Sequence, residues 1–232
     1  MSSHLCQHAE GVMDKLIILF CSFCMTIGLL SAQCLPDAHN TDLNSGWISC
    51  STSLSPNPGR GAGHWIVYDL TFEYFLEDLH IWNYNHPDGL DQGARTISVD
   101  ISNDAQVWSP IGSYSLPRAD GTPTYVGYDL IPNLNRRARY VLLSMENNYG
   151  AACTALGEVR IGIADETNCV EEYTLMGSLP SRKYRAHQSI EAQGVLPTNS
   201  VLHLQAQNEI LLNQGFEASI ASELEIEIGP CD

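Results

Sequence analysis

Positive charge is scarce in this sequence. It contains 11 Lys+Arg against 27 Asp+Glu among 232 residues, a formal net charge of −16. A surface of this sign repels the phosphate backbone of nucleic acids and the anionic face of membranes. We therefore expect no nucleic-acid partner and no binding to acidic lipid surfaces. Because negative charge also keeps proteins soluble, it does not identify a ligand.

Long apolar runs are also scarce, and the longest is Leu16–Leu30. This run is shorter than the ~20 residues that a membrane-spanning helix needs. Lys15 precedes it and the small residues of Ser31–Gln33 follow it, which is the order found in signal peptides. We predict a signal peptide at residues 1–32, no membrane span, and a secreted or cell-surface protein. Met13 is an alternative start for the leader.

Motifs for catalysis are missing as well. Gly59–Gly63 is rich in glycine but lacks the Lys-Ser/Thr pair of a phosphate-binding loop. The sequence has neither Gly-x-Ser-x-Gly nor His-Glu-x-x-His. Asp88 and Asp91 could be paired carboxylates for glycoside hydrolysis, which needs them about 5–10 Å apart, or they could solvate a loop. We predict that the protein is not an enzyme, with a glycan-active enzyme as a minor alternative.

The cysteines do not form a zinc-binding pattern, because none of those after the leader lies in Cys-x-x-Cys spacing. Export makes disulfides the default for cysteines, and an odd number leaves one thiol over. Five cysteines remain after the predicted leader: Cys34, Cys50, Cys153, Cys169 and Cys231.

Short apolar-alternating segments recur between clusters of Gly, Pro, Asn and Asp. Such a pattern is typical of an all-β sandwich or barrel. No long amphipathic helix interrupts it. The predicted strands are residues 64–70, 79–83, 96–102, 140–145 and 156–163.

The composition changes after Ile163, and the remaining segment contains no tryptophan. We therefore predict two units after the leader, at residues 33–163 and 164–232. Short, closely spaced strands in the second unit suggest a small β-coil or solenoid-like stack. They are residues 201–206, 208–212, 215–218 and 224–228.

Several segments of the first unit resemble the coagulation factor V/VIII type C (discoidin) domain, a galactose-binding-like family. The matching pieces lie in family order at residues 40–47, 63–70, 97–108, 139–142 and 155–161. The chain departs from the family at Asn103–Ala105, where a turn that ends in Gly is usual. The second unit resembles small C-terminal modules of secreted bacterial proteins through residues 210–218, and this likeness implies only a stalk, spacer or presentation role.

The discoidin resemblance implies a jelly-roll β-sandwich that binds ligands through loops at one end. Relatives in the carbohydrate-binding group often hold a structural calcium, here at Asn40, Asp42, Asn44 and Glu158; the alternative is that these residues cap turns or face solvent. The resemblance also implies a Cys50–Cys153 disulfide. A Cys169–Cys231 disulfide would then close the second unit and leave Cys34 unpaired, although four cysteines allow three connectivities.

Sugar recognition needs an aromatic face and planar polar groups. The loops at residues 83–86 and 146–150 and the glycine-rich turn at residues 59–63 supply both. The alternative is that each of these residues has a structural role in the sandwich. We predict a carbohydrate-binding or adhesion protein with a glycan or cell-surface ligand; a structural or protein-interaction component is the alternative. The predicted ligand-binding residues are Arg60, His64, Asn83, Tyr84, Asn85, His86, Asn147, Asn148 and Tyr149.

Overall fold

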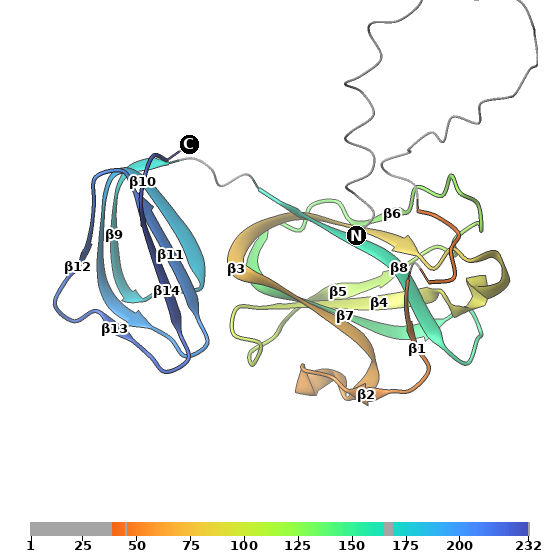
Figure 1. The fold of residues 1–232 in the computed structure, drawn as a ribbon. Coiled ribbons are helices and arrows are strands. Elements are labelled where there is room, and N and C mark those ends of the chain that lie inside the picture. Colours follow the sequence, from red (N-terminus) through yellow and green to blue (C-terminus); the bar gives the residue numbers. More distant parts are fainter. Residues whose placement is uncertain (1–38, 45, 165–168, 232) are drawn as a thin grey trace, which may run out of the picture. The chain divides into compact units, whose positions relative to one another are not determined.

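The computed structural model describes residues 39–44, 46–164 and 169–231, and these residues form two separate sheets. The predicted signal peptide and Cys34 lie outside the described residues. The first sheet has eight strands (Figure 1): β1 (Trp47–Ser49), β2 (Ser53–Leu54), β3 (Ala62–Asn83), β4 (Ala94–Ser102), β5 (Ser109–Ser115), β6 (Tyr128–Ile131), β7 (Arg136–Asn148) and β8 (Thr154–Ile163). Two short 3-10 helices, η1 (Pro58–Arg60) and η2 (Pro87–Gln92), flank β3.

Strand β3 belongs to both layers of a β-sandwich. Its first part pairs antiparallel with β2 and β7, and its last part pairs antiparallel with β6 and β8. Between them the ladder with β7 shifts register after Asp69, and Thr71 adopts a φ of 71°. Figure 1 shows β3 curving through this corner. One layer is therefore β2-β3-β7-β4-β5, and the other is β6-β3-β8-β1.

The core lies between the two layers because apolar residues alternate along each strand. Successive side chains of a strand point to opposite faces of its sheet. In β4, Ile97 and Val99 are fully buried in the core. They meet Leu143 of β7 in the same layer, and Leu79 and Leu156 of the facing layer. This arrangement confirms the all-β fold that the sequence predicts.

The second sheet is a parallel coil. Its strands are β9 (Val170–Ser178), β10 (Arg182–Leu196), β11 (Val201–Ala206), β12 (Glu209–Leu212), β13 (Glu217–Ala218) and β14 (Glu223–Ile228). Every pairing between them is parallel, and equivalent positions stack from rung to rung: Tyr184 pairs with Leu204, and Leu204 with Ile226. Parallel pairing of successive segments requires the chain to return each time to the same edge, which is the geometry of the predicted β-coil.

The observed strands include every segment that the sequence predicts, with two differences. The predicted strands at residues 64–70 and 79–83 are parts of one continuous strand, β3. Strands β1, β2, β5, β6, β9 and β10 were not predicted, although β10 is the longest strand of the coil. No strand pairing among the described residues joins the two sheets, and we retain the division at residue 163 as a proposal.

Both expected disulfides are present, Cys50–Cys153 in the sandwich and Cys169–Cys231 in the coil. Cys50 follows β1 and Cys153 precedes β8, so this bond joins the ends of two paired strands. Across the part of the chain that the structure describes, no helix has the length and hydrophobicity to cross a membrane.

Leu143→Ala tests the core of the sandwich. Leu143 is fully buried, so the substitution leaves a cavity and should lower the free energy of unfolding by about 2–5 kcal/mol. Val107→Ala is the control, because Val107 is 72% exposed and should change it by less than about 0.5 kcal/mol. Urea unfolding followed by tryptophan fluorescence measures both. Equal effects of the two substitutions would contradict the assigned core.

Candidate functional site

Asn83, at the end of β3, is part of the frame of the sandwich. Its side chain is fully buried, and its Nδ2 donates to the carbonyl oxygens of Ala94 and Pro117, each at 2.8 Å. Its Oδ1 accepts from the backbone N–H of Tyr84 at 2.9 Å. A Cβ on Gly93 would lie 2.7 Å from the same Oδ1, so only glycine fits there. The polar groups of Asn83 therefore hold the neighbouring loops and have no exposed surface for a ligand.

Asn85 and Tyr84 hold loop backbone in the same way. The Nδ2 of Asn85 donates to the carbonyl oxygens of Thr122 at 2.7 Å and His39 at 3.2 Å, and its Oδ1 accepts from the N–H of Gly121. The Tyr84 hydroxyl donates to the carbonyl oxygen of Leu43 at 3.1 Å. The two side chains are 2% and 1% exposed. Both side chains therefore hold loop backbone in place and do not face solvent.

Three other predicted ligand residues also make hydrogen bonds to the backbone of the sandwich. His86 caps η2, with its Nδ1 accepting from a backbone N–H at 3.3 Å. Asn148 donates through Nδ2 to the carbonyl oxygens of Ala151 and Cys153, each at 2.9 Å. The Tyr149 hydroxyl donates to the carbonyl oxygen of Leu116 at 2.7 Å. These side chains are partly exposed, whereas Asn147 is exposed.

Arg60 is fixed by an ion pair with a buried carboxylate. Its Nε and Nη2 both donate to Asp100 at 2.8 Å, and the Asp100 side chain has no exposed surface. This hydrogen bonding raises the pKa of Arg60 against the opposing effect of burial. The guanidinium has five N–H donors, so three remain after the pair is made. The Arg60 side chain is 27% exposed, which leaves part of it accessible.

Arg60 and His64 line one hollow with two residues that the sequence analysis missed, Trp65 and Glu146. The hollow has a volume of about 340 Å³ and opens between the start of β3 and the end of β7. Glu146 accepts a hydrogen bond from the Ser98 hydroxyl. Ser144 also lines the hollow, and its buried Oγ has no hydrogen-bond partner within the described residues.

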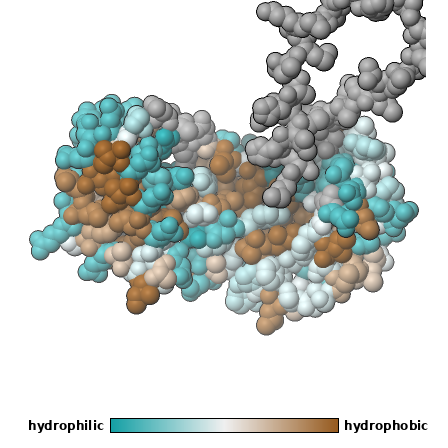
Figure 2. Space-filling view, in the orientation of Figure 1, coloured by the Kyte–Doolittle hydropathy of each residue, from teal (hydrophilic) through white to brown (hydrophobic). Residues whose placement is uncertain are grey.

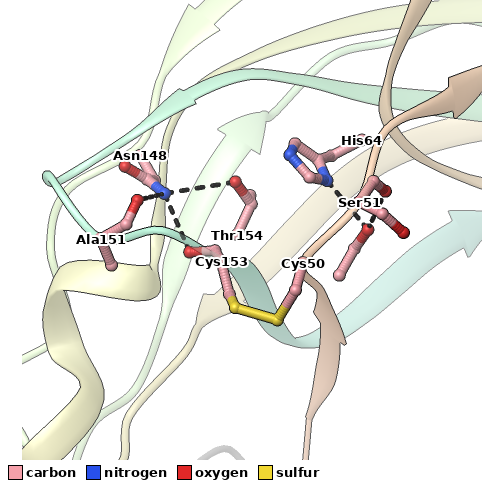
Figure 3. Close-up of a disulfide and its surroundings, with 8 residues drawn as sticks. Cys50, Ser51, His64, Asn148, Ala151, Cys153 and Thr154 are labelled. Carbon is pink, nitrogen blue, oxygen red and sulfur yellow. Dashed lines mark hydrogen bonds between the residues drawn. A yellow bond between two sulfur atoms is a disulfide. The ribbon is translucent and has the colours of Figure 1, made fainter.

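The hydrogen bonds of His64 define its tautomer (Figure 3). Its Nδ1 lies 2.9 Å from the Oγ of Ser49, and the Ser49 hydroxyl donates to the carbonyl of Ser51 at 3.0 Å. Because a serine hydroxyl has one proton, Oγ must accept from an N–H at Nδ1. In neutral His64 the Nε2 atom is then a hydrogen-bond acceptor. Cys50 lies between Ser49 and Ser51 in the sequence, so its disulfide with Cys153 anchors this segment.

Two of the four predicted calcium ligands cap turns. The Oδ1 atoms of Asn40 and Asp42 accept from the N–H groups of Asp42 and Asn44, each at 3.0 Å. Glu158 is exposed on β8, and its charge adds to burial in raising the pKa of Tyr68 to about 12. Carboxylates and amides are the ligand types that calcium takes. The described residues contain no group of three or more His, Cys, Asp or Glu side chains that could hold a metal, and calcium binding stays a prediction.

Neither a protein-family model nor a curated protein matches the chain. Similar chains occur among solved structures. A pectin-binding carbohydrate-binding module is 18% identical with a TM-score of 0.34, and the match covers 56% of this chain and 81% of that one. The CBM32 domain of AlyQ, solved with 4,5-unsaturated mannuronic acid, is 18% identical with a TM-score of 0.36, covering 56% and 85%. A family 89 glycoside hydrolase from Clostridium perfringens is 18% identical with a TM-score of 0.33, covering 44% and 10%.

Asn85→Ala distinguishes a supporting residue from a binding residue. The change leaves the carbonyl oxygens of Thr122 and His39 without this donor and should destabilise the fold by about 1–3 kcal/mol. Asn147→Ala is the matched control, since Asn147 is exposed and should leave stability unchanged. Thermal unfolding of the two variants measures the difference. An unchanged melting temperature for Asn85→Ala would refute the supporting role.

Ser49→Ala tests the assigned tautomer of His64. Long-range ¹H–¹⁵N spectra should show the proton on Nδ1 in the parent protein at neutral pH. Loss of the Ser49 acceptor should shift His64 toward the Nε2–H form, while Ser49→Thr, which keeps the hydroxyl, should preserve the parent spectrum. A parent protein with its proton on Nε2 would contradict the assignment.

Proposed function

We propose that this chain is a secreted, non-catalytic protein that binds carbohydrate in the hollow lined by Arg60, His64, Trp65 and Glu146. The observation that carries the proposal is that Trp65, Arg60 and Glu146 line one hollow, while the ring of His64, the neighbour of Trp65 on β3, is bonded to Ser49. His64 and Trp65 come from the start of β3, Glu146 from the end of β7 and Arg60 from η1, where its ion pair with Asp100 fixes it.

The side chains of the hollow suit the two surfaces of a sugar. The C–H face of a sugar ring is apolar and packs on an aromatic ring, here Trp65. Vicinal hydroxyls both donate and accept, and they require planar partners of both kinds. Arg60 supplies donors, whereas the carboxylate of Glu146 supplies acceptors. Ligand sites commonly combine an apolar wall with a few placed polar groups of this kind.

The charges around the hollow favour a neutral sugar. Arg60 is the one cation that lines it, and its charge is balanced by buried Asp100. Glu146 adds a further negative charge, and the whole chain carries −16. An acidic sugar would bring another carboxylate into this environment, at an electrostatic cost. Neutral hexoses and their oligosaccharides are therefore the proposed ligand class.

The same carboxylates support a binding role over hydrolysis. Glycosidases use two carboxyl groups, one as an acid and the other as a nucleophile or base. Asp100 is engaged with Arg60 through both of its oxygens, and Glu146 accepts from Ser98. Neither is arranged as a free acid beside a free base. The proposal therefore keeps the chain non-catalytic.

The resemblance to discoidin domains supports the proposal at the level of sequence segments. Secretion depends on the predicted leader at residues 1–32, which lies outside the described residues. Structural calcium at Asn40, Asp42, Asn44 and Glu158 remains part of the proposal. The partner of the protein would be a glycan of a cell surface or matrix. The coil at residues 169–231 would present the sandwich to it.

Trp65→Ala and Glu146→Gln test the site. Residues 33–232 of the parent chain should bind defined neutral glycans on an array and in titration calorimetry, with and without calcium. Loss of the indole should weaken binding up to about tenfold, because aromatic contacts contribute about 0.5–1.5 kcal/mol. Glu146→Gln should weaken binding of the same sugars through loss of a charged acceptor.

Tyr128→Ala is the matched control, because Tyr128 is 43% exposed and lies on β6 in the other layer. It should leave sugar affinity unchanged. Circular dichroism must show that all three variants are folded. Binding that survives Trp65→Ala and Glu146→Gln would move the site elsewhere, and the absence of any glycan ligand would overturn the carbohydrate proposal in favour of a protein partner.

A further inference from the structure

The parallel coil has an open edge at β14. This strand stands last in the order β12-β10-β11-β14 and pairs only with β11 within the described residues. An edge strand presents unpaired N–H and C=O groups to which another strand can add. The edge of β14 is therefore a place where a further rung could form.

The inner column of the coil is uncovered at this edge. Leu204 and Ala206 of β11 are fully buried, and Ile226 and Ile228 stack on them in β14. These two isoleucines are 46% and 57% exposed, although they occupy the same column. The space-filling view shows hydrophobic residues bordered by hydrophilic ones on the coil (Figure 2). A further strand would remove the isoleucines from water, which is the main favourable term in such additions.

The outer columns end in carboxylates. Lys183, His203 and Glu225 stack in one column, and the Nδ1 of His203 lies 3.3 Å from Glu225. Arg185, Gln205 and Glu227 stack in the next, with Arg185 donating to Gln205 at 2.9 Å. Both columns run from a cation to an anion. The next rung would therefore match them best with cations at alternate positions.

A second copy of the chain does not fit this edge. Pairing β14 with itself would place Glu223, Glu225 and Glu227 opposite the same three carboxylates. Like charges directly opposite each other in a sheet are destabilising. The rest of the chain offers little compensation, since acidic residues outnumber basic ones by 27 to 11.

We propose that β14 is a docking edge for an extended segment of a partner protein in which apolar and basic residues alternate. Its backbone would continue the hydrogen-bond ladder of β11 and β14, as in β-strand addition. Its apolar side chains would cover Ile226 and Ile228, and its Lys or Arg side chains would pair with Glu225 and Glu227. This site is independent of the sugar-binding hollow.

The test uses residues 33–232 and an acetylated octapeptide of alternating Lys and Val. Added peptide should slow amide hydrogen exchange in Glu223–Ile228, and its affinity should fall as salt rises because the charged pairs are exposed. A peptide of the same composition with Lys and Val in separate blocks is the control, and it should give no protection. Alternating Glu and Val should give none either.

A charge exchange separates docking from general attraction to an acidic protein. The double variant E225K/E227K should lose at least about tenfold in affinity for the Lys peptide and gain affinity for the Glu peptide. Ile226→Thr with Ile228→Thr should weaken both complexes while leaving the coil folded by circular dichroism. No protection of residues 223–228, or equal binding of the blocked peptide, would overturn the proposal.

Discussion

The structure depends on one strand that serves two layers. Because β3 bends after Asp69, its first part closes the layer of β7 and its last part closes the layer of β8. The core forms between the two layers to which these two parts of β3 belong. Strand β3 also carries residues of the candidate site and of its supporting frame. The start of β3 carries His64 and Trp65, and its end carries the buried Asn83 that ties down the neighbouring loops.

The ion pair of Arg60 and Asp100 places a fully buried carboxylate in the sandwich. A carboxylate without exposed surface is costly to bury, and removal of its partner would leave that cost uncompensated. The pair therefore works as a positional constraint. It holds the guanidinium through Nε and Nη2, and rotation of Arg60 to meet an anion would break contacts with a buried charge. This explains how a cation can line a site without making it a general anion site.

Period-two alternation made the strands readable from sequence, and Ile97 with Val99 in β4 shows why: β-branched residues on one face leave one register. Continuity of β3 was not readable, because Thr71 in a left-handed conformation carries no glycine signal. Strands β1, β2, β5, β6, β9 and β10 were missed, and β1 and β2 have only three and two residues in which to show any alternation. The all-β class and both disulfides were correctly predicted.

The candidate site was predicted only in part. Arg60 and His64 were singled out beside the glycine-rich turn, and the structure places both on one hollow. Asn83 and Asn85 have the composition of a binding loop, yet an amide that satisfies backbone groups looks the same in sequence as an amide that awaits a ligand. Trp65 was read as a strand residue. Its position next to His64 was the available signal, and the contribution of Glu146 depends on the pairing of β3 with β7, which one sequence does not reveal.

The Cys169–Cys231 disulfide has a mechanical consequence. Cys169 precedes the first strand of the coil and Cys231 follows the last one, so the bond joins the two ends of the whole stack. A pulling force applied before Cys169 and after Cys231 would pass through the sulfur atoms and bypass every rung. The hydrogen bonds between the rungs would carry none of that tension. Under traction the coil would keep its shape.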